Sequence, residues 1–292
     1  MAVIPPPFPL FRLLAGSVCI SFSPVFIKLA ATDPDLAGFY RMFFAALALL
    51  PLLLVRGDSL RVTRPTLLLL IGCGIFLGID FMFWHRSIGL IGPGLSTLLG
   101  NFQVFFTALL SWLFLREKIT VLFGLALMMA IGGLLLITGT DLAALSQVTR
   151  LGILFGLATA VFYSAYIMLI KQAMSSGQAS GVTTMLWVSI SCSLFMALVS
   201  LAKGVPFVLP NSQALLSLAG VGMISTALGW SMLSSAIRLV PATLAGLVLL
   251  LQPTLAFLWD VLLFQRPTGG LEYLGIVLIL TAIYLGTYRR RH

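Results

Sequence analysis

Two glutamines stand near the start of two similar apolar stretches. Gln103 belongs to "NFQVFFTALLSWLFLREK" (residues 101–118) and Gln252 to "LLQPTLAFLWDVLLFQR" (residues 250–266). An amide in apolar surroundings must find a hydrogen-bond partner or face a wet cavity. We expect both glutamines to line one central cavity and bind a polar ligand, although such stripes also occur where helices pack. Asn101 lies on another helix face, and we expect it to make a packing hydrogen bond.

Aromatic residues supply a second kind of contact with a ligand. Several lie three or four positions from one another or from an acidic residue, which places them on shared helix faces. An aromatic face with a polar tip suits a ligand that has both an apolar part and polar groups. The residues predicted to bind it, beside the two glutamines, are Asp80, Phe83, Trp84, Tyr163, Tyr166 and Trp230.

Arg41 and Asp80 are charged residues inside apolar segments. A charge there costs several kcal/mol unless it is paired or solvated. Counted from the segment ends, the two residues lie at similar depth, so we expect them to form a charge pair. Other ionisable residues lie nearer to segment ends and are expected to form a hydrated rim: Lys28, Asp33, Asp35 and Asp260.

Two prolines lie in the middle of apolar segments, Pro24 in "SFSPVF" and Pro253 in "LLQPTL". Proline cannot donate a backbone hydrogen bond, so it breaks or kinks a helix. A kink can serve packing alone, but broken helices in both halves of a chain also shape a binding site and permit motion. We predict that both prolines act as hinges.

Metal, disulfide and enzyme chemistry find little support in the sequence. Cys19, Cys73 and Cys192 stand singly in apolar runs, and His85 has no second histidine or acid at metal-ligand spacing. The chain has no nucleophile elbow, no His-Glu-x-x-His motif and no glycine-rich phosphate loop. We therefore expect no metal, no cofactor and no catalytic residue.

The composition is that of an integral membrane protein. The 292 residues are 60% hydrophobic and 9% charged, and the mean hydropathy is +1.12, whereas soluble domains carry about 25% charged residues. The net charge of +9 does not indicate nucleic acid, because the cations lie in short connections and at the C-terminal end, where lipid headgroups explain them. The N-terminal residues contain no basic leader followed by a cleavage site, so we expect no cleaved signal.

Windows of about twenty residues, the length that crosses a hydrocarbon core, predict ten transmembrane helices. Turn and charge chemistry separates them. Aromatic residues also gather at the ends of such helices, which is an alternative explanation for Trp84. The predicted spans are Leu10–Ala31, Leu36–Val55, Thr66–Ile88, Pro93–Leu115, Ile119–Gly139, Leu151–Ala173, Val182–Ala202, Gln213–Ile237, Pro241–Phe264 and Gly270–Tyr288.

The distribution of Lys and Arg predicts the orientation of these helices. Of the 17 cations, eleven lie on the side that holds the N-terminus. The six on the other side are Lys28, Arg41, Arg86, Arg150, Lys203 and Arg266. Because cytoplasmic loops carry the excess of cations, both termini are expected in the cytoplasm and the connection Asp141–Thr149 outside.

The two glutamine stretches indicate an internal repeat. Sliding the second half over the first by about 149 residues places Gln252 on Gln103. The chain therefore divides into a first five-helix repeat, residues 1–140, and a second, residues 150–292. An odd number of spans makes the second repeat enter the membrane from the opposite side. Inverted repeats of this kind let one central site face either compartment.

The sequence resembles the EamA-domain family of the drug/metabolite transporter superfamily over nearly its whole length. The motifs are "FYRMFFAALALLPLLL" in the second span, "LFLREKIT" at the end of the fourth and "LFGLALMMAIGGLLLI" in the fifth. Within that family it is most similar to the YddG-like exporters of aromatic and neutral amino acids. Two positions depart from the pattern: Val104 stands where the fourth span often has a kink-forming proline, and Gln265-Arg266 replaces an acidic residue.

The resemblance implies an inner-membrane carrier that exports amino acids by alternating access, with the lipid bilayer as its surroundings. We expect a monomer that works by facilitated diffusion. Proton coupling would need an acid that changes protonation at mid-depth, and the predicted partner Arg41 would keep Asp80 ionised. A drug or other small-metabolite exporter, with or without proton coupling, and a non-transporting membrane scaffold remain alternatives.

Overall fold

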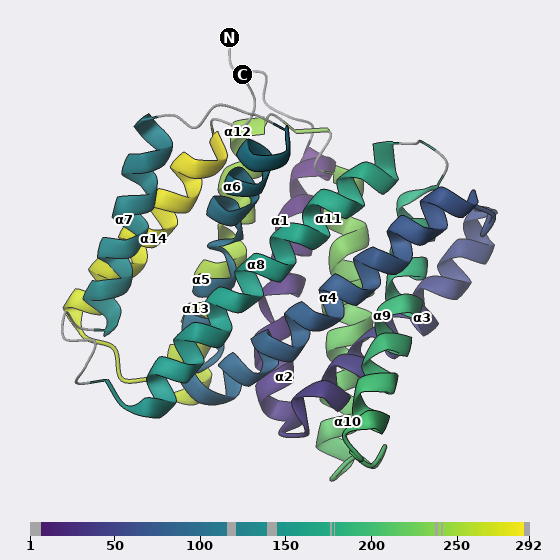
Figure 1. Ribbon diagram of the computed structural model, residues 1–292, viewed down its shortest axis with the longest axis horizontal. Coiled ribbons are helices and arrows are strands. Elements are labelled where there is room, and N and C mark those ends of the chain that lie inside the picture. Colours follow the sequence, from purple (N-terminus) through teal and green to yellow (C-terminus); the bar gives the residue numbers. More distant parts are fainter. Residues whose placement is uncertain are drawn as a thin grey trace.

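The computed structural model describes residues 7–115, 121–138, 145–175, 177, 179–236, 239–240 and 242–288, and every regular element in these ranges is a helix (Figure 1). The elements are α1 (Pro7–Ser21), α2 (Ser23–Ala30), α3 (Pro34–Arg56), α4 (Arg64–Ile91), α5 (Pro93–Gly100), α6 (Gln103–Leu115), α7 (Val121–Thr138), α8 (Gln147–Ser175), α9 (Gly181–Ala202), α10 (Ser212–Gly220), the π-helix η1 (Val221–Gly229), α11 (Trp230–Ala236), α12 (Ala242–Leu249), α13 (Leu251–Phe264) and α14 (Gly270–Tyr288).

The described helices match the predicted membrane spans. Within the described residues, nine segments are long and apolar enough to cross a membrane, and Gly270–Gly286 within α14 is a shorter apolar helix. The ends differ by a few residues: the third segment runs over Arg64–Ile91 rather than Thr66–Ile88. The prediction of an all-helical membrane protein is confirmed.

Several of these helices have a capping side chain at their N-terminus. Asp33 accepts hydrogen bonds from the backbone N–H groups of Asp35 (2.9 Å) and Leu36 (3.1 Å), so it caps α3. Ser180 caps α9 and Asn211 caps α10 in the same manner. Such caps satisfy N–H groups that have no partner in the first turn.

Three crossing segments are broken in their middle. The breaks before Pro24 and Pro253 separate α1 from α2 and α12 from α13, as the sequence predicts. The break at Asn101 and Phe102, between α5 and α6, contains no proline. There the backbone hydrogen bonds tighten to three-residue spacing, so the helix is interrupted although Val104 replaces the usual proline.

The π-helix η1 is a further irregularity, between α10 and α11. The Thr226 hydroxyl donates to the carbonyl oxygen of Val221, five residues earlier, at 2.8 Å. π-Helical turns are rare in proteins overall, but those that occur are often found at functional sites. The sequence does not predict this element.

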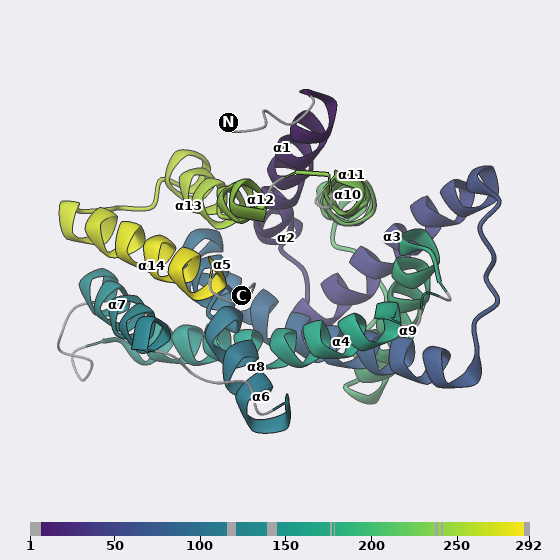
Figure 2. The ribbon, with the colours of Figure 1, turned by 90° about the horizontal axis from the view of Figure 1, so that it is seen from above.

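The helix pairs of the two halves correspond to one another. α4 packs along α8. In the corresponding contact, the segment of α1 and α2 packs along the segment of α10, η1 and α11. α3 packs on its counterpart α9, and α7 on its counterpart α14. Figures 1 and 2 show α7 and α14 side by side at one edge of the molecule. One apolar core joins α5, α6, α7, α13 and α14, and another joins α3, α4, α8 and α9.

The contact between α7 and α14 has matched glycines at its centre. A Cβ atom on Gly133 would lie 2.5 Å from the carbonyl oxygen of Gly275, and a Cβ on Gly275 would lie 2.5 Å from the carbonyl oxygen of Gly133. Small residues let helix backbones approach closely in a membrane. The reciprocal contact is what a two-fold relation between the halves produces.

Candidate functional site

A central cavity of about 150 Å³ lies between the helices of both halves. Its walls come from α1 to α5 of the first half and from α8, α9, η1, α11 and α13 of the second. It is lined by Ile20, Ser21, Ser23, Pro24, Arg41, Met42, Leu77, Asp80, Phe81, Trp84, Thr97, Gly100, Asn101, Thr159, Tyr163, Tyr166, Met185, Thr226, Trp230, Gln252 and Ala256.

Four of the predicted aromatic residues line this cavity. Trp84 comes from the first half, and Tyr163, Tyr166 and Trp230 come from the second. The two tyrosine rings stack, with centroids 5.5 Å apart and planes at 25°. The cavity therefore has an aromatic wall that can contact the apolar part of a ligand.

Phe83 lies away from the cavity, contrary to the prediction. Asp80 and Trp84, one turn apart, define the cavity face of α4, and Phe83 points from a neighbouring face of the helix. Its ring stacks on Phe162 of α8 at 5.5 Å and also lies near Phe155. Phe83 thus belongs to the α4–α8 packing interface.

In the fourth predicted span, the sequence predicts Gln103 as a cavity residue and Asn101 as a packing residue, and the structure reverses which of the two lines the cavity. Gln252 lines the cavity as predicted, and so does Asn101, whose amide also donates to the carbonyl oxygen of Thr97 at 2.8 Å. Gln103 is not among the lining residues, and its side-chain oxygen accepts from the Thr107 hydroxyl at 3.0 Å. In an unbroken helix, the directions of the two side chains would follow from their spacing. The break between α5 and α6 interrupts this regular spacing, so Asn101 rather than Gln103 lines the cavity.

Arg41 is buried at the cavity wall, with 6% of its surface exposed. Its Nε donates to the Thr226 hydroxyl of η1 at 3.2 Å. The guanidinium also lies over the Phe81 ring, 4.2 Å from its centroid, and near the Trp84 ring. These contacts fix the orientation of the cation, and among the described residues Nη1 has no hydrogen-bond partner.

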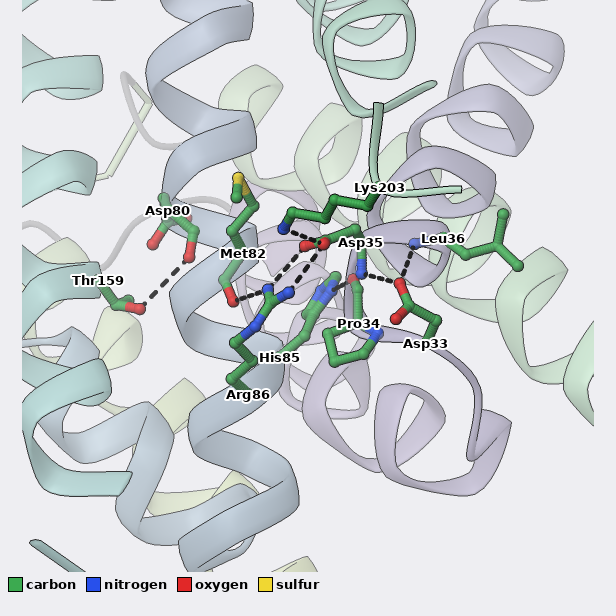
Figure 3. A network of polar contacts seen from close by, with 10 residues as sticks. All are labelled: Asp33, Pro34, Asp35, Leu36, Asp80, Met82, His85, Arg86, Thr159 and Lys203. Carbon is green, nitrogen blue, oxygen red and sulfur yellow. Dashed lines mark hydrogen bonds and ion pairs between the residues drawn. The ribbon is translucent and has the colours of Figure 1, made fainter. Parts of the chain in front are cut away.

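Asp80 is buried at the same cavity, with 4% of its surface exposed. Figure 3 shows its backbone oxygen accepting from the Thr159 hydroxyl, at 3.4 Å. No described donor reaches the carboxylate oxygen Oδ1. The ion pairs within 4.0 Å in the described chain do not include Arg41 with Asp80. Both residues line one cavity, but in the described chain they form no ion pair within 4.0 Å, so the charge pair stays a prediction.

The two prolines lie at helix breaks but differ in their relation to the cavity. Pro24 lines it, next to Ser21 and Ser23 of the same break. Pro253 is buried beside Gln252 and is not among the lining residues of the cavity. Whether either proline acts as a hinge stays a prediction.

Small hydroxyl residues on the cavity wall were missed by the sequence analysis. They do not stand out because Ser and Thr are common in membrane helices as packing residues. The helix-breaking motif "SFSPVF" was the available signal for the first two. These residues are Ser21, Ser23, Thr97, Thr159 and Thr226.

Asp35 forms an ion-pair network at the end of the bundle opposite to the start of α1 and the end of α14; we call this the far end (Figures 1 and 3). Its fully buried carboxylate accepts from Arg86 at 2.6 and 2.7 Å and from Lys203 at 2.6 Å. His85 Nδ1 lies 2.9 Å from the carbonyl oxygen of Pro34 in the same network. Asp35 is therefore not a hydrated rim residue as predicted, and it joins α3 and α4 to α9 of the other half.

Asp260 forms a second network at the far end, and it too is buried rather than hydrated. Its carboxylate lies 3.6 Å from Lys28 Nζ and 3.7 Å from Arg266 Nη1, and it accepts from the backbone N–H of Gly94 at 3.0 Å. Gly92, with φ of 87°, passes so close that a Cβ would meet the carboxylate at 2.5 Å. Arg266 also donates to the carbonyl oxygen of Ile91, at 2.9 Å. This network also joins the two halves.

The described chain contains no group of three or more His, Cys, Asp or Glu residues that could hold a metal ion. Cys73 and Cys192 are buried free thiols within it.

Comparison with known proteins finds one family over most of the chain. The EamA-like transporter family matches residues 8–139 and again residues 150–288. An "uncharacterized transporter" of Synechocystis is 23% identical over 235 residues, which cover 78% of this chain and 69% of that protein. A "probable amino-acid metabolite efflux pump" of Escherichia coli is 25% identical over 274 residues, which cover 91% of this chain and 86% of that protein.

A protein of known crystal structure shares the fold. It superposes with a TM-score of 0.68 at 17% identity, and the alignment covers 97% of each chain. The repeated family match, the apolar crossing helices and the cavity between corresponding helices agree with one another. This multi-pass membrane protein belongs to the EamA-like transporter family.

Proposed function

We propose that this protein exports neutral amino acids, aromatic ones included, across a bacterial-type inner membrane. The observation that carries the proposal is the central cavity, in which aromatic rings, amides and hydroxyls from both halves meet two opposite charges of the first half. A small molecule with an apolar side chain and polar groups matches such a wall. The printed name of the Escherichia coli relative, an amino-acid metabolite efflux pump, supports this substrate class.

The proposed mechanism is alternating access by a monomer without a cofactor. The two halves are inverted repeats, residues 1–140 and 150–292, and rocking of one against the other exposes the cavity to each side in turn. With the termini in the cytoplasm, the far end faces outward. The Asp35 and Asp260 networks then hold the outer side closed.

Counterflow in proteoliposomes tests the proposal. Vesicles containing purified protein are loaded with one unlabelled neutral amino acid, and uptake of trace labelled phenylalanine is followed without an ion gradient. We expect saturable uptake that loaded substrate accelerates. Uptake equal to that of protein-free vesicles, across a panel of neutral and aromatic amino acids, would exclude amino-acid export and favour the scaffold alternative or another metabolite.

The energy source of export is part of the proposal. We propose facilitated diffusion, in which the higher internal concentration of the amino acid drives export. The alternative is proton coupling. One observation favours it: Asp80 has no ion-pair partner within 4.0 Å in the described chain. Accumulation of substrate above equilibrium under an imposed pH gradient would establish coupling, and loss of that accumulation in Asp80→Asn with exchange left intact would make Asp80 the proton carrier.

A further inference from the structure

We propose that Arg41 and Asp80 are the two poles of a zwitterion-binding site: the guanidinium holds the carboxylate of the substrate, and the Asp80 carboxylate holds its ammonium group. The inference rests on the proposed function and states how the cavity selects its substrate class. It assigns specificity to two side chains that lie on α3 and α4 of the same half.

Neither charge has an ion-pair partner within 4.0 Å in the described chain. Both side chains are more than nine-tenths buried, and Nη1 of Arg41 and Oδ1 of Asp80 have no hydrogen-bond partner among the described residues. A buried, unpaired charge is costly, and two such charges of opposite sign would normally close on each other. Here they stay more than 4.0 Å apart in the described chain.

Neighbouring side chains hold the Arg41 guanidinium in place. Thr226 accepts from Nε on one side. The Cζ atom of Arg41 lies over the Phe81 ring, 4.2 Å from its centroid, and 5.4 Å from the centroid of the Trp84 ring. Arginine fixed in this way presents its remaining N–H groups as a fork, which matches the two oxygens of a carboxylate.

The described cavity wall carries one charge of each sign. Arg41 and Asp80 are the charged residues among those that line the cavity in the described chain. One positive and one negative group select a ligand with one charge of each sign and no others. An amine without a carboxylate, or an acid without an ammonium group, leaves one pole uncompensated. A neutral amino acid compensates both.

The experiment compares three competitors of labelled phenylalanine exchange in proteoliposomes: phenylalanine, phenethylamine and phenylpropionate. The last two each lack one charged group. Arg41→Gln should weaken competition by phenylalanine about 30-fold or more and change competition by phenethylamine little. Asp80→Asn should do the same to phenylalanine and spare phenylpropionate. This crossed pattern is not produced by a loss of folding.

Matched controls remove the same charges away from the cavity. Arg12→Gln lies on α1, where the guanidinium packs over Phe8, and Asp58→Asn lies at the contact with Ser180. Both should keep the competitor ranking of the wild type. If Arg41→Gln or Asp80→Asn does not fold, as judged by thermal unfolding in detergent, Arg41→Lys and Asp80→Glu replace them, and each should shift the ranking in the same direction.

The outcomes separate the inference from the proposed function. A wild-type protein that exchanges none of the amino acids overturns both. A wild type that exchanges phenylalanine, with variants that weaken all three competitors equally or leave the ranking unchanged, overturns the zwitterion site and leaves amino-acid export standing.

Discussion

Gln252 and Gln103 lie near the starts of α13 and α6, but their side chains have different surroundings. Gln252 lines the cavity, whereas Gln103 accepts from Thr107 on its own helix. We predict that Gln252→Leu lowers phenylalanine exchange roughly 5-fold, the effect of one lost hydrogen bond, without lowering the unfolding temperature. Proteoliposome exchange and thermal unfolding measure the two quantities.

Gln103→Leu is the matched control for that variant. The Thr107 hydroxyl also donates to the backbone oxygen of Gln103, at 2.6 Å, so losing the amide leaves no unpaired hydroxyl. Exchange should stay at the wild-type level. An equal loss of exchange in both variants would contradict the division of roles and return Gln103 to the site.

The sequence predicts the chemistry of the site better than its geometry. Asp80, Trp84, Tyr163, Tyr166, Trp230 and Gln252 line the cavity as predicted. Gln103 and Phe83 do not, because their directions depend on a helix break and on packing against α8, neither of which residue spacing reveals. Arg41 and Asp80 reach the same cavity, but residue spacing alone does not give the distance between their charged groups.

At the scale of elements, the Asp35 network joins α3, α4 and α9. We predict that Asp35→Asn lowers the free energy of unfolding by about 1–3 kcal/mol. The range is below the 3–5 kcal/mol that a broken buried pair costs, because Arg86 and Lys203 are partly exposed, 27% and 43% by side chain, and water screens them. Chemical unfolding in detergent measures the change.

Asp33→Asn provides the control, two residues away. Asp33 caps α3, and asparagine caps helices about as well as aspartate. The stability of this variant should match the wild type within experimental error. Equal free energies of unfolding for Asp35→Asn and Asp33→Asn would show that the Asp35 network stabilises the protein no more than a solvated surface ion pair does.

The α7–α14 contact leads to a second prediction for elements. Gly133→Ala places a Cβ against the backbone of α14, so we expect a loss of about 1–3 kcal/mol, as for overpacked cores. Gly132→Ala, where nothing lies within 4 Å of the new Cβ, should be neutral or stabilising because alanine favours helix. Thermal unfolding of the two neighbouring variants compares them, and equal losses would contradict the close contact.

Most elements could be predicted from the sequence, because apolar length and turn residues determine membrane helices. The breaks before Pro24 and Pro253 follow from proline chemistry. The break at Asn101 and the π-helix Val221–Gly229 could not be foreseen. They depend on packing between segments far apart in the chain, which local propensity does not encode.

For the whole molecule, the cation count predicts the orientation. A reporter that is active only in the cytoplasm should be active when fused after His292, and one fused within residues 141–149 should not. Residues 141–144 lie outside the described part of the chain. A C-terminal fusion active only outside the cell would reverse the orientation, and the far-end networks would then face the cytoplasm.

The corresponding helices of the two halves do not have the same shape. α4 and α8 run unbroken through Arg64–Ile91 and Gln147–Ser175, whereas their counterparts contain the π-helix η1 and the break between α1 and α2. If each half adopted the shape of the other, the protein would open to the opposite side. The two facing states would then have similar free energies, differing through the sequence differences between repeats, so a modest ligand preference could reverse their populations. Spin labels at both ends of α8 should report a shorter helix in the second state, and a constant length in all states would exclude this exchange of shapes.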